Sequence, residues 1–239
     1  MAKSILIAAA EPGTGKSLVT IGLINALLYK AKKIGYFKPI INADPREKKD
    51  IHIETVINHF QLPIRYEDSF AFTRQEALQF IESESQGEMI DTIIAKYKLS
   101  EETFDFTVME GSDFSGEGVA IEFELNLLIA KNLCCPAILV VSGEHKTAPQ
   151  ILNESLNFLH NFKDHDVQVL AMIINKVNPG QAEAVREIFS GQVSKDTIIS
   201  VIPANPVLQS PTIPEIFENL KGQLLFGEES LDNPVDNFL

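Results

Sequence analysis

The segment from Ala10 to Ser17 contains the residues whose types and spacing point most clearly to chemistry. It has a small residue, four variable positions and then Gly-Lys-Ser. Glycines let backbone N–H groups turn inward around phosphate oxygens, and a helix starting beside Lys16 adds the positive end of its dipole. In such a loop the lysine reaches the β- and γ-phosphates of a nucleotide and the serine hydroxyl binds Mg²⁺. We therefore expect a nucleotide to contact the whole run: Glu11, Pro12, Gly13, Thr14, Gly15, Lys16 and Ser17.

A second interpretation of this loop stays open, namely a glycine-rich turn that binds nothing. Ala10 stands where the commonest form of the motif has its first glycine, and Glu11 places a carboxylate beside the expected phosphates. The surroundings favour the functional interpretation, because the loop lies between an apolar run typical of a buried strand and a helical stretch, as the motif requires.

Acidic residues that could hold the metal follow two other expected strands. Glu110 ends an apolar strand and precedes Gly111, the place where an acid in such proteins commonly holds Mg²⁺. Asp44 and Asp50 lie in the polar loop after the second strand, and the alternative for both is a solvated loop acid. We predict a metal site of Ser17, Glu110 and Asp44.

Lys38 and Asn175 are expected at the same edge of the sheet, where open α/β sheets bind ligands. Lys38 comes at the end of the second strand, where it is either exposed or binds the anionic end of a second ligand. Asn175 follows an expected strand, and its amide is either a turn residue or a reader of an adenine or guanine edge, since it offers both a donor and an acceptor. We include both in the predicted nucleotide-binding set.

The remaining residues with metal or redox chemistry do not form a recognisable site. His52 and His59 are seven residues apart, which favours a polar helix face over a site, and the other histidines lack metal-ligand spacing. Cys134 and Cys135 are adjacent, which favours neither a structural disulfide nor a zinc site.

Apolar runs of strand length alternate with helical stretches along the chain. Expected strands cover 4–9, 36–39 (stopped by Pro39), 104–109, 137–141, 167–174 and 197–202, and expected helices cover 18–33, 51–61, 74–83, 88–98, 121–133, 148–162, 181–189 and 213–220. This alternation predicts a three-layer α/β/α fold with a mainly parallel central sheet. We expect one domain over 1–222, and the acidic segment 223–239 to be a linker or the start of a following domain.

Composition and charge limit the classes of partner that this protein is expected to bind. The 239 residues are 45% hydrophobic and 22% charged, typical of a globular protein, and the net charge of −13 disfavours nucleic acid and anionic membranes. The N-terminus has no apolar signal-peptide region and no apolar run reaches membrane-spanning length, so we expect a cytoplasmic protein.

Six segments together resemble the N-terminal domain of bacterial phosphotransacetylase (phosphate acetyltransferase) over about residues 3–220. They are AAAEPGTGKS, GYFKPI, VMEGSDFSGEG, LNLLIAKNL, PAILVVSG and MIINKVNP. That domain is itself similar to dethiobiotin synthetase, an ATP-dependent ligase with a phosphate-binding loop (P-loop). The resemblance implies a P-loop NTPase-like fold, ATP or another nucleotide with Mg²⁺, a regulatory role and a homo-oligomer. It also implies a C-terminal acetyltransferase domain in the same chain that converts acetyl-CoA and phosphate to acetyl phosphate and CoA, so that this segment alone lacks that activity.

Two alternatives remain beside the regulatory domain. A stand-alone ligase of the dethiobiotin synthetase type is suggested by Lys16, Ser17, Glu110 and Lys38, which match phosphate, metal and substrate positions of that family. The residues after Pro39 and Gly111 depart from that family's pattern where its substrate lies, which argues against the ligase. The other alternative is an assembly module that binds no nucleotide, suggested by Glu11.

Overall fold

A seven-stranded sheet in the order β3-β2-β4-β1-β5-β6-β7 forms the centre of the molecule, and its strand pairs are all parallel. The computed structural model describes residues 4–9, 11–112 and 119–208 and the isolated positions 213, 214, 216, 231 and 235. The strands are β1 (Ser4–Ala9), β2 (Ile34–Ile41), β3 (Phe70–Thr73), β4 (Phe106–Glu110), β5 (Ala137–Ser142), β6 (Val169–Val177) and β7 (Ile198–Pro203).

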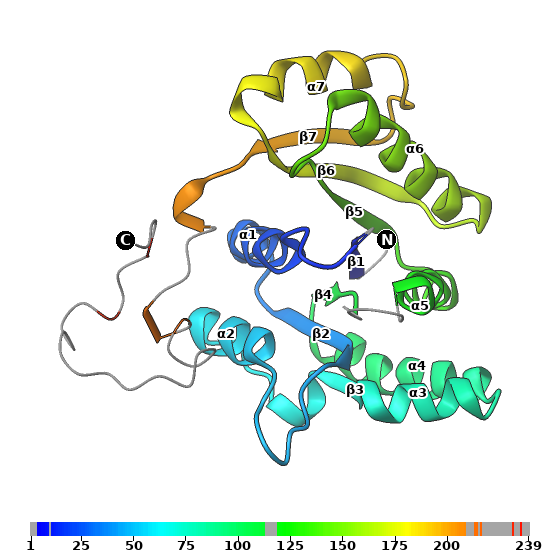
Figure 1. Cartoon of the computed structure of the whole chain (residues 1–239). Helices are drawn as coiled ribbons and strands as arrows, with labels where there is room; N and C mark the ends of the chain where they lie inside the picture. The colour runs from blue at the N-terminus through cyan, green and yellow to red at the C-terminus, as the bar shows by residue number, and fades with distance from the viewer. Residues whose placement is uncertain are drawn as a thin grey trace.

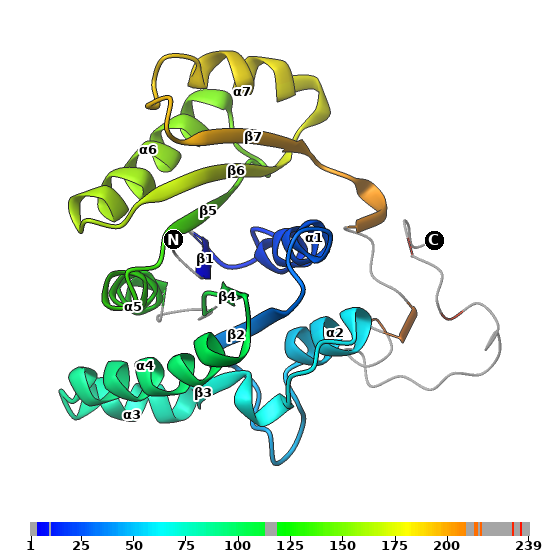
Figure 2. The same cartoon turned by 180° about the vertical axis from the view of Figure 1, so that it is seen from behind.

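Helices cover both faces of this sheet, which confirms the predicted three-layer α/β/α fold (Figure 1). One face packs against α1 (Lys16–Leu28) and α2 (Ile51–Phe60). The other face packs against α3 (Arg74–Glu82), α4 (Gln86–Thr103), α5 (Val119–Asn132), α6 (Ala148–Asp164) and α7 (Ala182–Phe189). The view from behind shows the same separation (Figure 2), and short 3₁₀ turns occur at η1 (Tyr66–Asp68), η3 (Pro179–Gln181) and η4 (Pro206–Leu208).

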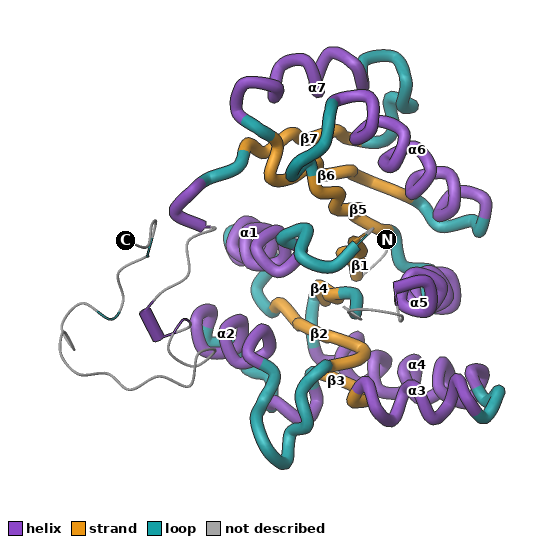
Figure 3. Tube along the Cα trace, viewed as in Figure 1, coloured by secondary structure: helices purple, strands orange, loops and turns teal. Residues whose placement is uncertain are grey.

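The strand order brings several loops to one edge of the sheet. From β1 the chain passes to β2 and β3, β4 then inserts between β2 and β1, and β5 pairs on the other side of β1. In such a sheet, ligands bind outside the carboxyl ends of the strands at the point where the order reverses. The loops after β1, β2, β4, β5 and β6 therefore meet at this edge, and Figure 3 shows the loop between β1 and α1 in the middle of the molecule.

Pro39 does not stop the second strand, contrary to the expectation from the sequence. β2 continues to Ile41 because Ile40 and Ile41 still pair with β3. The last β2–β4 pair is Phe37 with Met109, so Pro39 lies beyond that ladder and its missing N–H leaves no bond unmade. On the other side of β2, Lys38 N donates to Ser69 O at 2.8 Å.

Two other differences concern local length. The sequence pattern missed β3, a four-residue strand at the edge of the sheet whose residues do not alternate in burial. It also extended the first helix to residue 33, whereas α1 ends at Leu28 and β2 begins at Ile34. The expected helix over 213–220 and the segment 223–239 lie largely outside the described residues.

Within the described part of the chain, no helix combines the length and the apolar character that crossing a bilayer requires.

Candidate phosphate and metal site

The loop between β1 and α1 depends on two glycines with positive φ. Gly13 has φ 73° and Gly15 has φ 86°, the left-handed region that favours glycine. A Cβ on Gly15 would also overlap the amide nitrogen of Asn175, which donates to Thr14 O at 2.8 Å. Asn175 is 5% exposed, so β6 braces the loop through this amide. Its predicted contact with a nucleotide base stays a prediction.

Lys16 begins α1 and points into the protein. Its side chain is buried, and Nζ donates to Ser112 O, just after β4, at 2.8 Å. A buried ammonium needs such an acceptor. Ser112 is held in turn, because its N–H donates to Asn126 Oδ1 on α5 at 3.0 Å. Lys16, the lysine expected to bind phosphate, is therefore held toward the end of β4.

Ser17, His52 and Glu110 form a closed cluster next to Lys16. Ser17 Oγ donates to Glu110 Oε1 at 3.0 Å, and His52 Nδ1 lies 2.6 Å from Ser17 Oγ and 2.9 Å from Glu110 Oε1. The second carboxylate oxygen, Oε2, accepts from Tyr36 OH at 3.2 Å. The predicted metal ligands Ser17 and Glu110 thus lie together, although α1 and β4 contribute them separately.

Glu110 is fully buried and yet ionised. Burial raises the pKa of a carboxyl group, but the hydrogen bond from His52 and the positive charges of Lys38 and Lys16 outweigh it and lower the pKa of Glu110 from 4.5 to about 2. Lys38 Nζ lies 3.9 Å from Glu110 Oε1. The site therefore presents a full negative charge at neutral pH to any cation that binds beside Ser17.

Asp50 and Lys38 form a buried ion pair, so neither is the exposed residue that one interpretation of the sequence allowed. Lys38 Nζ lies 3.1 Å from Asp50 Oδ2, and the two residues are 2% and 5% exposed. Asp50 also caps α2, because its carboxylate accepts from the N–H groups of His52 and Ile53. This cap fixes the first turn of α2 and thereby places His52 against Ser17 and Glu110.

Asp44 has a different partner from the one expected of a metal ligand. Its carboxylate binds Arg46 through Nε at 3.0 Å and through the terminal NH2 at 2.8 Å, and these bonds lower the pKa of Asp44. Within the described ranges it forms no hydrogen bond or ion pair with Ser17 or Glu110, whereas Asp50 binds Lys38 beside them. The metal-ligand role of Asp44 stays a prediction.

Lys146 neutralises the unusual acid of the phosphate loop. Its Nζ, on the connection between β5 and α6, hydrogen-bonds the carboxylate of Glu11 and lies 2.6 Å from Glu154 Oε2 on α6. Burial lowers the pKa of Lys146, but the hydrogen bonds that it donates to the two carboxylates outweigh this effect and raise the pKa above its ordinary value. The carboxylate of Glu11 is thus engaged by a cation.

One buried hydroxyl at this edge fits a bound phosphate. Among the side chains of the described residues, Thr14 Oγ1 is buried without a hydrogen-bond partner, as are Ser112 Oγ and Asn126 Nδ2 nearby. Buried polar atoms are rarely left unpaired, and an orphaned donor within a phosphate loop is suited to a phosphate oxygen. The residues present therefore fit an anionic ligand.

A family model described as an AAA domain matches residues 3–212 of the sequence. The chain belongs to this AAA domain family.

Curated relatives of this AAA domain include phosphate acetyltransferases and a dethiobiotin synthetase. The phosphate acetyltransferase of Nitratidesulfovibrio vulgaris is 33% identical to this chain over 243 residues, and that of Synechocystis sp. is 33% identical over 240 residues. These matches cover 100% of this chain and 34% of each relative, so the chain spans about a third of their length. The ATP-dependent dethiobiotin synthetase of Bacillus velezensis is 22% identical over 224 residues, which cover 90% of this chain and 93% of that protein. The resemblance inferred from the six segments is thus confirmed.

Solved structures confirm the P-loop NTPase-like fold. FlhF in complex with GMPPNP and Mg²⁺ superposes with a TM-score of 0.52 at 16% identity, over 83% of this chain and 64% of FlhF. A plasmid partition protein of Borrelia burgdorferi bound to AMPPNP superposes with a TM-score of 0.50 at 13% identity, over 97% and 94% of the two chains. At these identities the likeness establishes the fold alone.

Reasoning from the sequence missed three residues of the site: His52, Tyr36 and Lys146. The sequence favours a polar helix face for His52, whereas in the structure its ring contacts Ser17 and Glu110. Two local signals point to the first two residues. His52 comes two positions after a helix-capping aspartate, and Tyr36 lies two positions before Lys38 on the same face of β2. No local signal marks Lys146.

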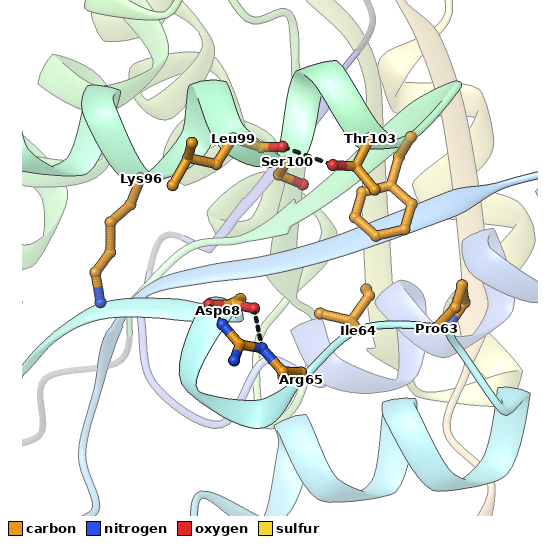
Figure 4. A pocket seen from close by; sticks show the side chains of 9 residues that line it. Pro63, Ile64, Arg65, Asp68, Lys96, Leu99, Ser100 and Thr103 are labelled. Carbon is orange, nitrogen blue, oxygen red and sulfur yellow. Dashed lines mark hydrogen bonds and ion pairs between the residues drawn. The ribbon is translucent and has the colours of Figure 1, made fainter.

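A cavity of about 390 Å³ lies away from this site, near the amino-terminal ends of β3 and β4. Figure 4 shows the side chains that line it. Pro63, Ile64, Leu99 and Phe104 form its apolar lining, with Lys96 and the Arg65–Asp68 ion pair among its polar groups. Phe104 precedes β4, whereas Glu110 ends it, so the length of this strand separates the cavity from the phosphate loop. This cavity is therefore separate from the candidate phosphate site, which is formed by the loop backbone and buried charged side chains.

Proposed function

We propose that this AAA domain binds a nucleoside triphosphate together with Mg²⁺ at the loop of residues 10–17. The observation that carries the proposal is the contact of Ser17 with the buried, ionised Glu110, flanked by the cations Lys16 and Lys38. This arrangement offers a carboxylate and a hydroxyl to a divalent cation and the ammonium group of Lys16 to the phosphates, while Lys38 stays paired with Asp50. The GMPPNP with Mg²⁺ and the AMPPNP bound by the structural neighbours FlhF and the partition protein accord with it.

Different residues of the chain would bind the phosphates and the metal ion. Backbone N–H groups of residues 13–17 surround the phosphates, and Lys16 exchanges its bond to Ser112 O for one to a phosphate oxygen. Ser17 and Glu110 are the residues that would hold Mg²⁺, which when bound neutralises phosphate charge. In the described part of the chain, no three His, Cys, Asp or Glu side chains form a metal site by themselves. This suits Mg²⁺, which protein sites usually bind through one or two carboxylates together with phosphates and water.

Calorimetric titration with ATP, ADP and GTP, each with and without Mg²⁺, tests the proposal. We expect wild-type protein to bind in the micromolar range with Mg²⁺ and Lys16→Ala to lose that binding. Wild-type protein that shows no heat at millimolar nucleotide would reject the proposal and support the assembly module instead.

In the longer proteins that this chain resembles, we propose that the domain regulates an acetyltransferase domain further along the chain. The support is the 33% identity to phosphate acetyltransferases of which this chain spans about a third. A nucleotide acts in this way only if it binds two states of the whole protein unequally. The full-length enzyme should therefore respond to ATP in acetyl phosphate formation, and Lys16→Ala should abolish the response. An unchanged response would contradict regulation through this loop.

A ligase of the dethiobiotin synthetase type is the second candidate, favoured by the match that covers 93% of such a protein. The buried pair of Lys38 and Asp50 argues against it, because Lys38 would have to leave Asp50 to contact a substrate anion. ADP release on addition of ATP, diaminopelargonic acid and bicarbonate would establish the ligase, and its absence would reject it.

A further inference from the structure

Glu11 is a feature that nucleotide binding leaves unexplained. It is the second residue of the phosphate loop, and a free carboxylate there would repel a bound polyphosphate. Its carboxylate instead hydrogen-bonds Lys146, 135 residues later in the chain. Lys146 follows β5, so the partner comes from a neighbouring strand end at the same edge of the sheet.

We propose that Lys146 is a positioning residue for the phosphate loop, which neutralises Glu11 and ties the loop to the connection between β5 and α6. This inference rests on the nucleotide binding proposed above. Lys146 lies outside the loop, yet the affinity of the loop for phosphate depends on it. Its positive charge explains how Glu11 is tolerated in the loop.

The environment of Lys146 fixes its ammonium group in place. Its side chain is 18% exposed, and its Nζ is bound by Glu154 of α6 as well as by Glu11 of the phosphate loop. The start of α6 is itself fixed by Gln150, whose Oε1 accepts from the backbone N–H of Thr147 at 2.9 Å and from Thr147 Oγ1 at 2.8 Å. The position of Lys146 next to Glu11 is therefore set by α6.

The same corner of the protein also braces the middle of the loop. Gly143 N, three residues before Lys146, donates to Asn175 O at 2.7 Å, and Asn175 Nδ2 donates to Thr14 O. A Cβ on Gly143 would overlap Val177, so this connection packs closely on β6. Two contacts thus tie the loop to one unit: Glu11 through Lys146 and Thr14 through Asn175.

Four variants test this role by nucleotide affinity. Lys146→Met should raise the dissociation constant for Mg²⁺–ATP about tenfold, because it leaves Glu11 uncompensated beside the phosphates. Glu11→Gln should bind as well as wild type or more tightly. The double variant should bind within about twofold of Glu11→Gln, since the two changes remove one interaction and are not additive. Lys146→Arg, which keeps the charge, should retain most of the affinity.

Glu154→Gln is the matched control. It removes the charge of the other carboxylate bound to Lys146 but keeps an oxygen that accepts from Nζ and leaves Glu11 paired, so the affinity should stay within about twofold of wild type. Thermal unfolding of each variant shows whether the fold is kept. Equal affinities of wild type and Lys146→Met, or a double variant as weak as Lys146→Met, would overturn the positioning role.

A second measurement needs no nucleotide and separates failure of this inference from failure of the proposed function. Backbone ¹⁵N relaxation at Gly13 and Gly15 should report larger ps–ns motion in Lys146→Met than in wild type or Glu154→Gln. If wild type binds no nucleotide but the relaxation changes as expected, the proposed function fails and the anchoring of the loop holds. If the relaxation does not change, Lys146 does not anchor the loop.

Discussion

Ser17 Oγ and Glu110 Oε1 lie 3.0 Å apart although 93 residues separate them in the chain. The contact joins the first turn of α1 to the end of β4, two elements that meet because β4 pairs directly with β1. It links the phosphate loop to a buried negative charge, so Glu110 is the residue through which the metal dependence of this site is best tested.

Glu110→Gln should weaken binding of nucleotide in Mg²⁺ and leave the weaker metal-free binding nearly unchanged. The amide keeps the shape of the side chain but removes the charge that attracts the cation. We expect the dissociation constant for Mg²⁺–ATP to rise about tenfold or more, which is about 1.4 kcal/mol. Calorimetry with Mg²⁺ and with EDTA checks this. Glu183→Gln, on the exposed face of α7, is the control, and equal losses with and without Mg²⁺ would contradict the metal role.

Acid should destabilise the protein through Glu110. The pKa of this carboxyl is lowered from 4.5 to about 2 in the folded protein, so between these pH values the unfolded chain binds the extra proton. The stabilisation is present above pH 4.5 and is lost as pH falls toward 2. It amounts to about 3 kcal/mol at 1.36 kcal/mol per pKa unit.

Urea unfolding at pH 7 and at pH 3 measures this dependence in wild type and in Glu110→Gln. We expect a smaller fall in the free energy of unfolding in Glu110→Gln, because the titrating group is gone. Equal falls in both proteins would show that other carboxyl groups cause the acid sensitivity.

Gly15→Ala should destabilise the protein and abolish nucleotide binding. The left-handed φ of 86° costs an L-residue about 1–2 kcal/mol, and the new Cβ would also overlap Asn175. Gly15→Ala with Asn175→Ala should lose less stability than the sum of the single changes, because the overlap is relieved. Chemical denaturation checks both values.

Gly22→Ala is the matched control for that change. Gly22 lies within α1 and a Cβ there meets nothing within 4 Å, so alanine should leave stability unchanged or raise it by up to about 1 kcal/mol. Similar effects of the two substitutions would contradict the special conformation of Gly15.

Contiguous motifs made part of this site predictable from the sequence. The loop over residues 10–17 lies within one segment, and Glu110 is marked by the strand that it ends, so local pattern was sufficient for both. The fold followed from the alternation of strands and helices, except for β3, which is too short to show a period.

The partners of these residues were not predictable because they depend on how distant elements pack. Two aspartates lie in the loop after β2, and only the fold shows that Asp50 turns inward while Asp44 pairs with Arg46. Lys146 reaches Glu11 because β5 lies beside β1, a neighbour relation that no local pattern contains. Long-range pairing of charges is thus the part of the site that required the structure.

Lys38→Met should destabilise the protein more than replacement of both members of its ion pair. Lys38 and Asp50 are both buried, and removal of the lysine leaves the Asp50 carboxylate without its cation, which costs about 3–5 kcal/mol for a buried pair. In Lys38→Met with Asp50→Asn the buried charge is absent and asparagine still caps α2, so most of the loss should be recovered. Urea unfolding of the two variants measures the difference. A double variant as unstable as Lys38→Met would show that Lys38 stabilises the fold mainly through Glu110, 3.9 Å away, instead of through Asp50.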